Sequence, residues 1–264
     1  EAFSAFDSII TGSAYPHERI RSRWQEILLN QFHDVIPGSS IKEVYEDSEK
    51  MYGEIIKDGE KMLSGAIFDI EENINAAEGA LVFNPNGFTA DGEVIKDGES
   101  FFVKDVPPFG WKNVKLKNEE PEVRIDALSA ENKYFTLTLN EKGSVISLFD
   151  KREKREVIKK DSCGARLVLF EDNPYIYDAW NVERYGLYKP GEALENAEIT
   201  PFEDNISKGF TVKLTLHNSA VTQKIRLYGE TDRIDFETKV SWNEEHRLLK
   251  AVFPFDINSD SAAY

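Results

Sequence analysis

Apolar side chains recur at helical spacing over about the first 78 residues and give way to short strand-like runs after that point. The dipeptide Pro37-Gly38 is typical of a helix end, and Ser40 with Glu43 predicts a capping box at the start of another helix. Short loops between the helices predict an antiparallel bundle. We therefore expect three helices, over residues 2–10, 17–36 and 40–74.

From residue 80 onward, β-branched and aromatic residues come in short runs divided by Asn, Asp, Gly and Pro, a pattern typical of antiparallel strands. The stretch Asn118–Pro121 is acidic and poor in apolar residues, which indicates a linker. The run of strands after it predicts a sandwich or barrel. The expected strands are Ala80–Phe83, Glu93–Ile95, Phe101–Val103, Lys112–Leu116, Tyr134–Leu139, Val145–Phe149, Arg166–Phe170, Ala197–Phe202, Phe210–His217, Val221–Tyr228, Ile234–Trp242 and Leu248–Phe255.

These patterns predict an α+β fold with three parts. A three-helix bundle occupies residues 1–78, a small β segment with a linker occupies 79–120, and a partial antiparallel β-sandwich occupies 121–264. With 41% hydrophobic residues, the chain of 264 residues has enough apolar surface for a packed interior.

Charge and cysteine content exclude several classes of function. The 32 Lys and Arg residues against 48 Asp and Glu residues give a formal net charge of -16, so we expect binding neither to nucleic acid nor to an anionic membrane surface. No apolar run approaches the ~18 residues of a membrane span. The single cysteine, Cys163, excludes an internal disulfide and a multi-cysteine zinc site.

Candidate chemistry lies in the stretch Ile27–Ile36, which on a continuous helix is apolar on every side yet contains Asn30, Gln31, His33 and Asp34. A buried polar group without a partner costs about 1–3 kcal/mol. Four such groups predict a polar network, a ligand site or a docking surface. On spacing alone, His33 is a core or interface histidine, because a zinc site needs three or four ligands.

The sequence from Trp24 to Ser40, WQEILLNQFHDVIPGSS, resembles the signature of glycoside hydrolase family 38, the retaining α-mannosidases. The flanking Tyr15-Pro16 and Val44-Tyr45 also fit it. Phe32 stands where lysosomal and Golgi members carry a second histidine, which makes the chain more similar to the bacterial and cytosolic branch. The β half resembles the family more loosely, at Asn84-Pro85, 106–110, 140–150 and 178–180.

The resemblance implies an N-terminal catalytic domain, a three-helix bundle and galactose-mutarotase-like β-sandwich domains. It implies one zinc, or another divalent metal, held by four side chains, of which His33 is one and the other three come from the catalytic domain. It implies that Asp34 lies near the sugar, that carboxylates displace the aglycone through a covalent intermediate, and that the enzyme is cytoplasmic.

This chain departs from the family by beginning at the helix bundle. We therefore expect a middle fragment that lacks the nucleophile, the acid/base and three metal ligands, and whose sandwich is truncated at its C-terminus. The fragment by itself is expected to be inactive and metal-free. Its expected partners are the missing N-terminal catalytic domain and an α-mannoside substrate. The alternative is a non-catalytic carbohydrate-binding or scaffold module.

Two further expectations concern surfaces. A small bundle cannot cover every side of the second helix, so Leu29, His33 and Ile36 are expected to be exposed. A second stretch carries a cluster of aromatic residues, for which packing of a long loop is the expected role and sugar binding the alternative. Its aromatic residues are Tyr175, Tyr177, Trp180, Tyr185 and Tyr188.

Overall fold

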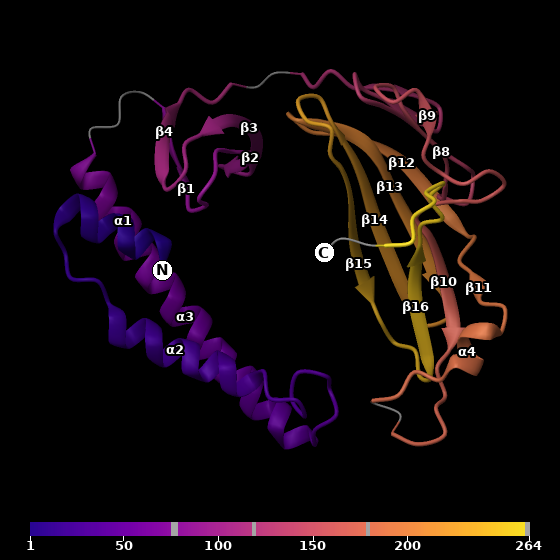
Figure 1. Ribbon diagram of the computed structural model, residues 1–264, viewed down its shortest axis with the longest axis horizontal. Coiled ribbons are helices and arrows are strands. Elements are labelled where there is room, and N and C mark those ends of the chain that lie inside the picture. Colours follow the sequence, from indigo (N-terminus) through magenta and orange to yellow (C-terminus); the bar gives the residue numbers. More distant parts are fainter. Residues whose placement is uncertain (75–78, 118–119, 178–179, 262–264) are drawn as a thin grey trace. The chain divides into compact units, whose positions relative to one another are not determined.

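The computed structural model describes residues 1–74, 79–117, 120–177 and 180–261 (Figure 1). Parts of the predicted linker and of the 178–180 motif, namely Asn118, Glu119, Asp178 and Ala179, lie outside these ranges. Two compact units form. The first comprises Glu1–Gly92, Val103–Leu116 and Tyr177–Asn181, and the second comprises Glu93–Phe102, Lys117–Ile176 and Val182–Tyr264.

The first unit contains three helices, which confirms the predicted number: α1 (Ala2–Thr11), α2 (His17–Asn30) and α3 (Lys42–Asn73). Helices α1 and α2 each pack against α3. Phe6, Ile20 and Ile70 are among the buried side chains of the bundle. Helix α1 ends at Gly12, whose φ of 77° places it in the left-handed region that glycine tolerates best.

An ionic clamp joins α2 to α3. Asp58 accepts hydrogen bonds from the guanidinium groups of Arg19 and Arg23, with 3.0 Å between Arg23 Nε and Asp58 Oδ2. These bonds hold the pKa of the Asp58 carboxyl well below its usual range. These charged hydrogen bonds connect α2 to α3 in addition to the apolar contacts between them.

The end of α2 and the start of α3 differ from the sequence prediction. Helix α2 ends at Asn30, because the backbone then bonds three residues back: Phe32 N donates to Leu29 O over 3.2 Å. The capping box is absent, since Ser40 Oγ donates to Asp34 O over 2.6 Å instead of capping α3. The Ser40 hydroxyl therefore stabilises the turn after α2, whereas the sequence predicted that it would cap α3.

A small β segment follows. Strand β1 (Ala80–Asn84) pairs with β4 (Gly110–Val114), and β2 (Ala90–Lys96) pairs with β3 (Glu99–Val106), close to the predicted runs. The Asn84 side chain is buried and donates to Phe88 O and Val106 O at 2.7 and 3.0 Å. This asparagine therefore fixes the turn after β1.

The second unit is built from antiparallel sheets (Figure 1). One sheet has the order β5-β6-β7-β8-β9, one has β12-β13-β14-β15, and β10 lies between β11 and β16. The strands are β5 (Arg124–Asp126), β6 (Ser129–Glu131), β7 (Phe135–Leu139), β8 (Val145–Asp150), β9 (Arg155–Glu156), β10 (Arg166–Glu171), β11 (Glu192–Ala193), β12 (Ala197–Glu203), β13 (Ser207–Leu216), β14 (Ser219–Tyr228), β15 (Ile234–Ser241) and β16 (Arg247–Val252).

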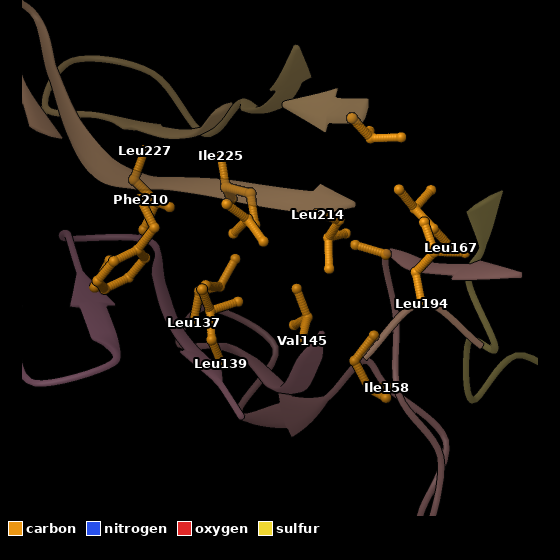
Figure 2. Packing of buried hydrophobic residues seen from close by; sticks show 14 of the residues in the cluster. Leu137, Leu139, Val145, Ile158, Leu167, Leu194, Phe210, Leu214, Ile225 and Leu227 are labelled. Atoms are coloured by element: carbon orange, nitrogen blue, oxygen red, sulfur yellow. The ribbon is translucent and has the colours of Figure 1, made fainter. Parts of the chain in front are cut away.

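The core of this unit lies between the two larger sheets. Figure 2 shows Leu137 and Leu139 of β7 facing Phe210, Ile225 and Leu227 of the other sheet. All five are at most 2% exposed. Alternate residues of β7 point into this core, as the period of two in the sequence predicts. The α+β class and the antiparallel β region are therefore confirmed.

Polar side chains connect the sheets at their ends. Asn132 is buried; its amide donates to Tyr228 O at 2.8 Å, and its Oδ1 accepts from the backbone amides of Tyr134 and Phe135.

Strands β5, β6, β9 and β11 and the short helix α4 (Arg184–Tyr188) were not predicted. Each has only two to five residues, too few to show a period.

Candidate functional site

His33 and Asp34 lie in the tight turn between α2 and α3. Ile36 N donates to Phe32 O at 3.1 Å, and Gly38 N donates to Val35 O at 3.1 Å, so the turn has a defined backbone. Tyr45, in the first part of α3, reaches back and accepts a hydrogen bond from Ser40 N over 2.8 Å. These bonds fix the backbone from which both side chains project.

Both side chains of this pair face solvent. The imidazole of His33 is 70% exposed and the carboxylate of Asp34 is 56% exposed, with 3.7 Å between His33 Nε2 and Asp34 Oδ2. The ring of Phe32 lies 4.2 Å from the imidazole, centroid to centroid. This exposure excludes the interpretation of His33 as a core histidine.

The other polar residues of the stretch do not join His33 in a network. Asn30 is buried and donates to Glu26 O and to Met51 Sδ, both at 2.9 Å, so it belongs to the helix contact. Gln31 is exposed. Of the three sequence interpretations, the polar network is therefore wrong, and a ligand site or a docking surface remains.

Exposed large apolar side chains precede and follow the pair in the sequence. Leu29 is 62% exposed and Ile36 is 67% exposed, which confirms their predicted exposure. We define the His33 face as His33 and Asp34 together with the exposed apolar residues nearest to them in the chain, Leu28, Leu29, Phe32 and Ile36. Leu28 and Phe32 were not predicted to be exposed, although the position of Phe32 shortly before Pro37-Gly38 was a usable signal for that residue.

The pair offers part of a metal site. An imidazole nitrogen and a carboxylate oxygen are both donors that zinc accepts, and both side chains reach solvent here. Among the described residues, no group of three or more His, Cys, Asp or Glu side chains is placed to hold a metal ion. The imidazole of His33 therefore fits a metal as one donor of a set that needs further ligands, and the carboxylate of Asp34 beside it is available for another contact.

The aromatic stretch between β10 and β11 is also on the surface. Tyr175 and Tyr188 are 89% and 81% exposed, so the expectation that these rings pack inside a loop is wrong for them. Tyr185 fits that expectation only in part, because its hydroxyl donates to Asn173 O while its side chain stays exposed. The sequence pattern alone could not distinguish rings that pack a loop from rings that are exposed on the surface.

Two family models match the chain. Residues 130–264 match the model described as "Glycosyl hydrolases family 38 C-terminal domain", and residues 1–70 match "Alpha mannosidase middle domain". The chain belongs to glycosyl hydrolase family 38. The family resemblance carried by Trp24–Ser40 is thereby confirmed.

The family 38 relatives are named α-mannosidases. The chain is 28% identical to "Alpha-mannosidase G" of Dictyostelium discoideum over 91% of its length, and 30% identical to "Alpha-mannosidase 2C1" of Homo sapiens over 95%. It spans only 28% and 26% of those proteins. The chain thus corresponds to about a quarter of the length of these relatives.

Solved structures show the same fold. "The crystal structure of an alpha-mannosidase from Enterococcus faecalis V583" superimposes with a TM-score of 0.76 at 16% identity, covering 96% of this chain and 40% of that one. A second family 38 protein from Enterococcus faecalis gives a TM-score of 0.77 at 18% identity, covering 96% and 42%. In the described part of this family 38 chain, none of the helices has the length and apolar character needed to cross a membrane.

Proposed function

We propose that this chain forms the helical middle region and part of the C-terminal β region of a zinc-dependent, retaining α-mannosidase. The observation that carries the proposal is the His33–Asp34 pair, held on a fixed turn and exposed within an apolar face of a family 38 chain. The names of the relatives supply the substrate class, an α-mannoside.

His33 is the proposed metal ligand. Its side chain is exposed on a turn whose backbone is fixed by hydrogen bonds, so a nitrogen of the ring can approach a metal held mainly by other residues. The ring of Phe32 contacts one side of the imidazole, at 4.2 Å between ring centroids. When bound, zinc would act as a Lewis acid that holds and polarises sugar hydroxyl groups.

Asp34 is the proposed substrate contact. The 3.7 Å between His33 Nε2 and Asp34 Oδ2 is longer than a hydrogen bond, and the carboxylate is 56% exposed, so its oxygens can accept hydrogen bonds from a sugar. A carboxylate is a strong acceptor for hydroxyl donors. We therefore assign Asp34 to orienting the mannoside, with the nucleophile and acid/base supplied from outside this chain.

The His33 face is the proposed docking surface for the catalytic domain. Leu28, Leu29 and Ile36 are each more than half exposed, and large apolar side chains left in solvent over a short stretch are typical of interaction sites. The occupant is argued from length, since the relatives carry roughly three quarters of their residues outside the matched region. The motif at Phe32 and Pro37-Gly38 further supports the cytoplasmic branch of the family.

The test uses the complete enzyme. His33→Ala should lose most bound zinc and activity, whereas Asp34→Asn should keep the metal and lose mainly turnover. His17→Ala, another exposed histidine on the same bundle, is the matched control and should change neither. Elemental analysis beside kinetics on an aryl α-mannoside measures both effects. Full zinc occupancy in His33→Ala would refute the ligand assignment.

A second measurement compares the hydrolytic activity of the isolated chain with that of the complete enzyme. The purified chain of 264 residues should not hydrolyse an aryl α-mannoside, with or without added zinc. The reason is that one imidazole and one carboxylate cannot supply both glycosidase carboxylates and a four-coordinate metal. Zinc-dependent turnover by this chain alone would contradict the proposed division of the active site.

A further inference from the structure

Strand β15 forms one edge of the four-stranded sheet β12-β13-β14-β15 in the second unit (Figure 1). All eight of its residues pair with β14, and among the described strands β14 is the one that pairs with it. The other side of β15 therefore presents backbone N–H and C=O groups that can bond a further strand. An edge of this kind can bind an added strand through its main chain.

The opposite edge of the same sheet is protected, whereas β15 is not. Strand β12 contains Pro201, which has no backbone N–H to donate, but the sequence of β15 is IDFETKVS, without proline. Strand β16 is also the edge of a sheet, but its charged residues, Arg247 and Lys250, are both positive. Strand β15 carries charges of both signs, so it can attract a second copy of itself.

The order of these charges selects one register for such a pair. In an antiparallel pair with its two-fold axis at Thr238, Glu237 of each copy lies opposite Lys239 of the other, which gives two opposite-charge pairs. An axis at Phe236, Glu237 or Lys239 would bring like charges together. An axis between two residues would place inward-facing side chains opposite outward-facing ones. The sequence of β15 therefore favours the axis at Thr238.

The same register joins the apolar faces of two sheets. Ile234 and Phe236 pack against the core of the unit, whereas Val240, on the same side of the strand, is 43% exposed. With the axis at Thr238, Phe236 of one copy lies opposite Val240 of the other. The pairing therefore covers apolar surface that is exposed in the single chain.

Glu237 is already held in place for this contact. Its Oε1 accepts a hydrogen bond from Arg226 Nη1 at 2.7 Å, while its side chain remains 48% exposed. Lys239 is exposed as well. A side chain that is held before binding loses less conformational entropy when the partner arrives.

We propose that β15 is the contact between two copies of this chain, related by a two-fold axis at Thr238, so that two four-stranded sheets join into one continuous sheet. The contact consists of main-chain hydrogen bonds, two Glu237–Lys239 pairs and two Phe236–Val240 contacts. It requires neither metal nor substrate and is independent of the proposed function.

Sedimentation of the full chain measures this contact. In about 0.15 M salt, which screens the repulsion between two chains of net charge -16, the chain should sediment at twice its mass of 30.1 kDa, and dilution should dissociate it. Lys239→Glu should weaken the dimer by roughly tenfold or more, because both opposite-charge pairs become like-charge pairs. The matched control is Lys213→Glu, the same change on an exposed residue of β13, which should dimerise as the parent chain does.

Cross-linking locates the axis. In a Cys163→Ser background, Thr238→Cys should form a disulfide between two chains under mild oxidation, because directly opposite residues of an antiparallel pair have Cβ atoms about 4.5–5.5 Å apart. The control is Thr200→Cys, exposed on the β12 edge, which should not cross-link. The complete enzyme with Thr238→Cys should cross-link as the chain does.

Three results would overturn the proposal: a mass of one chain at every concentration, a dimer that Lys239→Glu leaves unchanged, or a complete enzyme in which Thr238→Cys does not cross-link. The last result would show that another segment of the enzyme covers β15. Sedimentation and cross-linking use neither zinc nor sugar, so a failure of the mannosidase proposal would leave both results unchanged.

Discussion

Substitutions on the His33 face should have little effect on the stability of the chain alone and a large effect on the complete enzyme. The perturbation is the pair of substitutions Leu29→Ser and Ile36→Ser, which remove two large apolar side chains from the face. These residues are 62% and 67% exposed, so most of their apolar surface already meets water in this chain. Substituting them in the chain alone should change its free energy of unfolding by no more than about 0.5 kcal/mol.

In the complete enzyme the same substitutions should be costly if the catalytic domain covers the face. Full burial of a Leu or Ile side chain contributes about 1.5–3 kcal/mol. Because roughly 60% of each side chain remains to be buried, docking should lose about 1–2 kcal/mol per residue. The control is Ile20→Ala: Ile20 is 7% exposed within the bundle, and its truncation should cost the chain itself about 2–5 kcal/mol.

Urea unfolding of both proteins, followed by circular dichroism, measures these differences, and kcat/KM on an aryl α-mannoside reports the assembled site. Destabilisation of the chain alone by more than about 1 kcal/mol would show that the two residues already contribute to its interior. An unchanged complete enzyme would show that nothing docks on this face. Either result would refute the reasoning.

Three further predictions concern the β unit. Asn132→Ala should destabilise the chain by about 2–4 kcal/mol in urea unfolding, because three hydrogen bonds of a buried side chain are lost; a cost below about 1 kcal/mol would contradict this accounting. The side chain of Arg226 is 7% exposed and forms ion pairs with Glu93, Asp204 and Glu237. Arg226→Ala should lower the free energy of unfolding by about 3–5 kcal/mol. Arg226→Lys should restore only part of this loss, because lysine lacks the planar guanidinium group that bonds several carboxylates at once. Partial burial acts to raise the pKa of Glu156, but hydrogen bonds from Ser147 and three backbone amides outweigh it and lower the pKa. Its stabilising contribution should be present above the ordinary glutamate pKa and be lost as the pH falls through the lowered value; a pH series of urea unfolding should show this loss, and Glu156→Gln should flatten it.

Long elements and the family motif were accessible from the amino-acid sequence. Helix α3 and strand β7 each bury a periodic set of side chains, so their period predicts them without any knowledge of their neighbours. The motif from Trp24 to Ser40 was sufficient to indicate the family, and with it His33 and Asp34, because the signature is a contiguous run of residues.

The tertiary structure determined two features that the hydrophobic period of the sequence does not predict: where α2 ends and which side chains are exposed. A continuous apolar pattern over Ile27–Ile36 predicted a helix. The backbone tightens after Asn30 instead, where the hydroxyls of Ser40 and Tyr45 donate to the carbonyls of Asp34 and Val35. Exposure of Leu29 and of Tyr175 depends on which surfaces other elements cover, and a linear pattern carries no such information. The sequence therefore determined the family and the long periodic elements, whereas the packing of distant segments determined which side chains reach solvent.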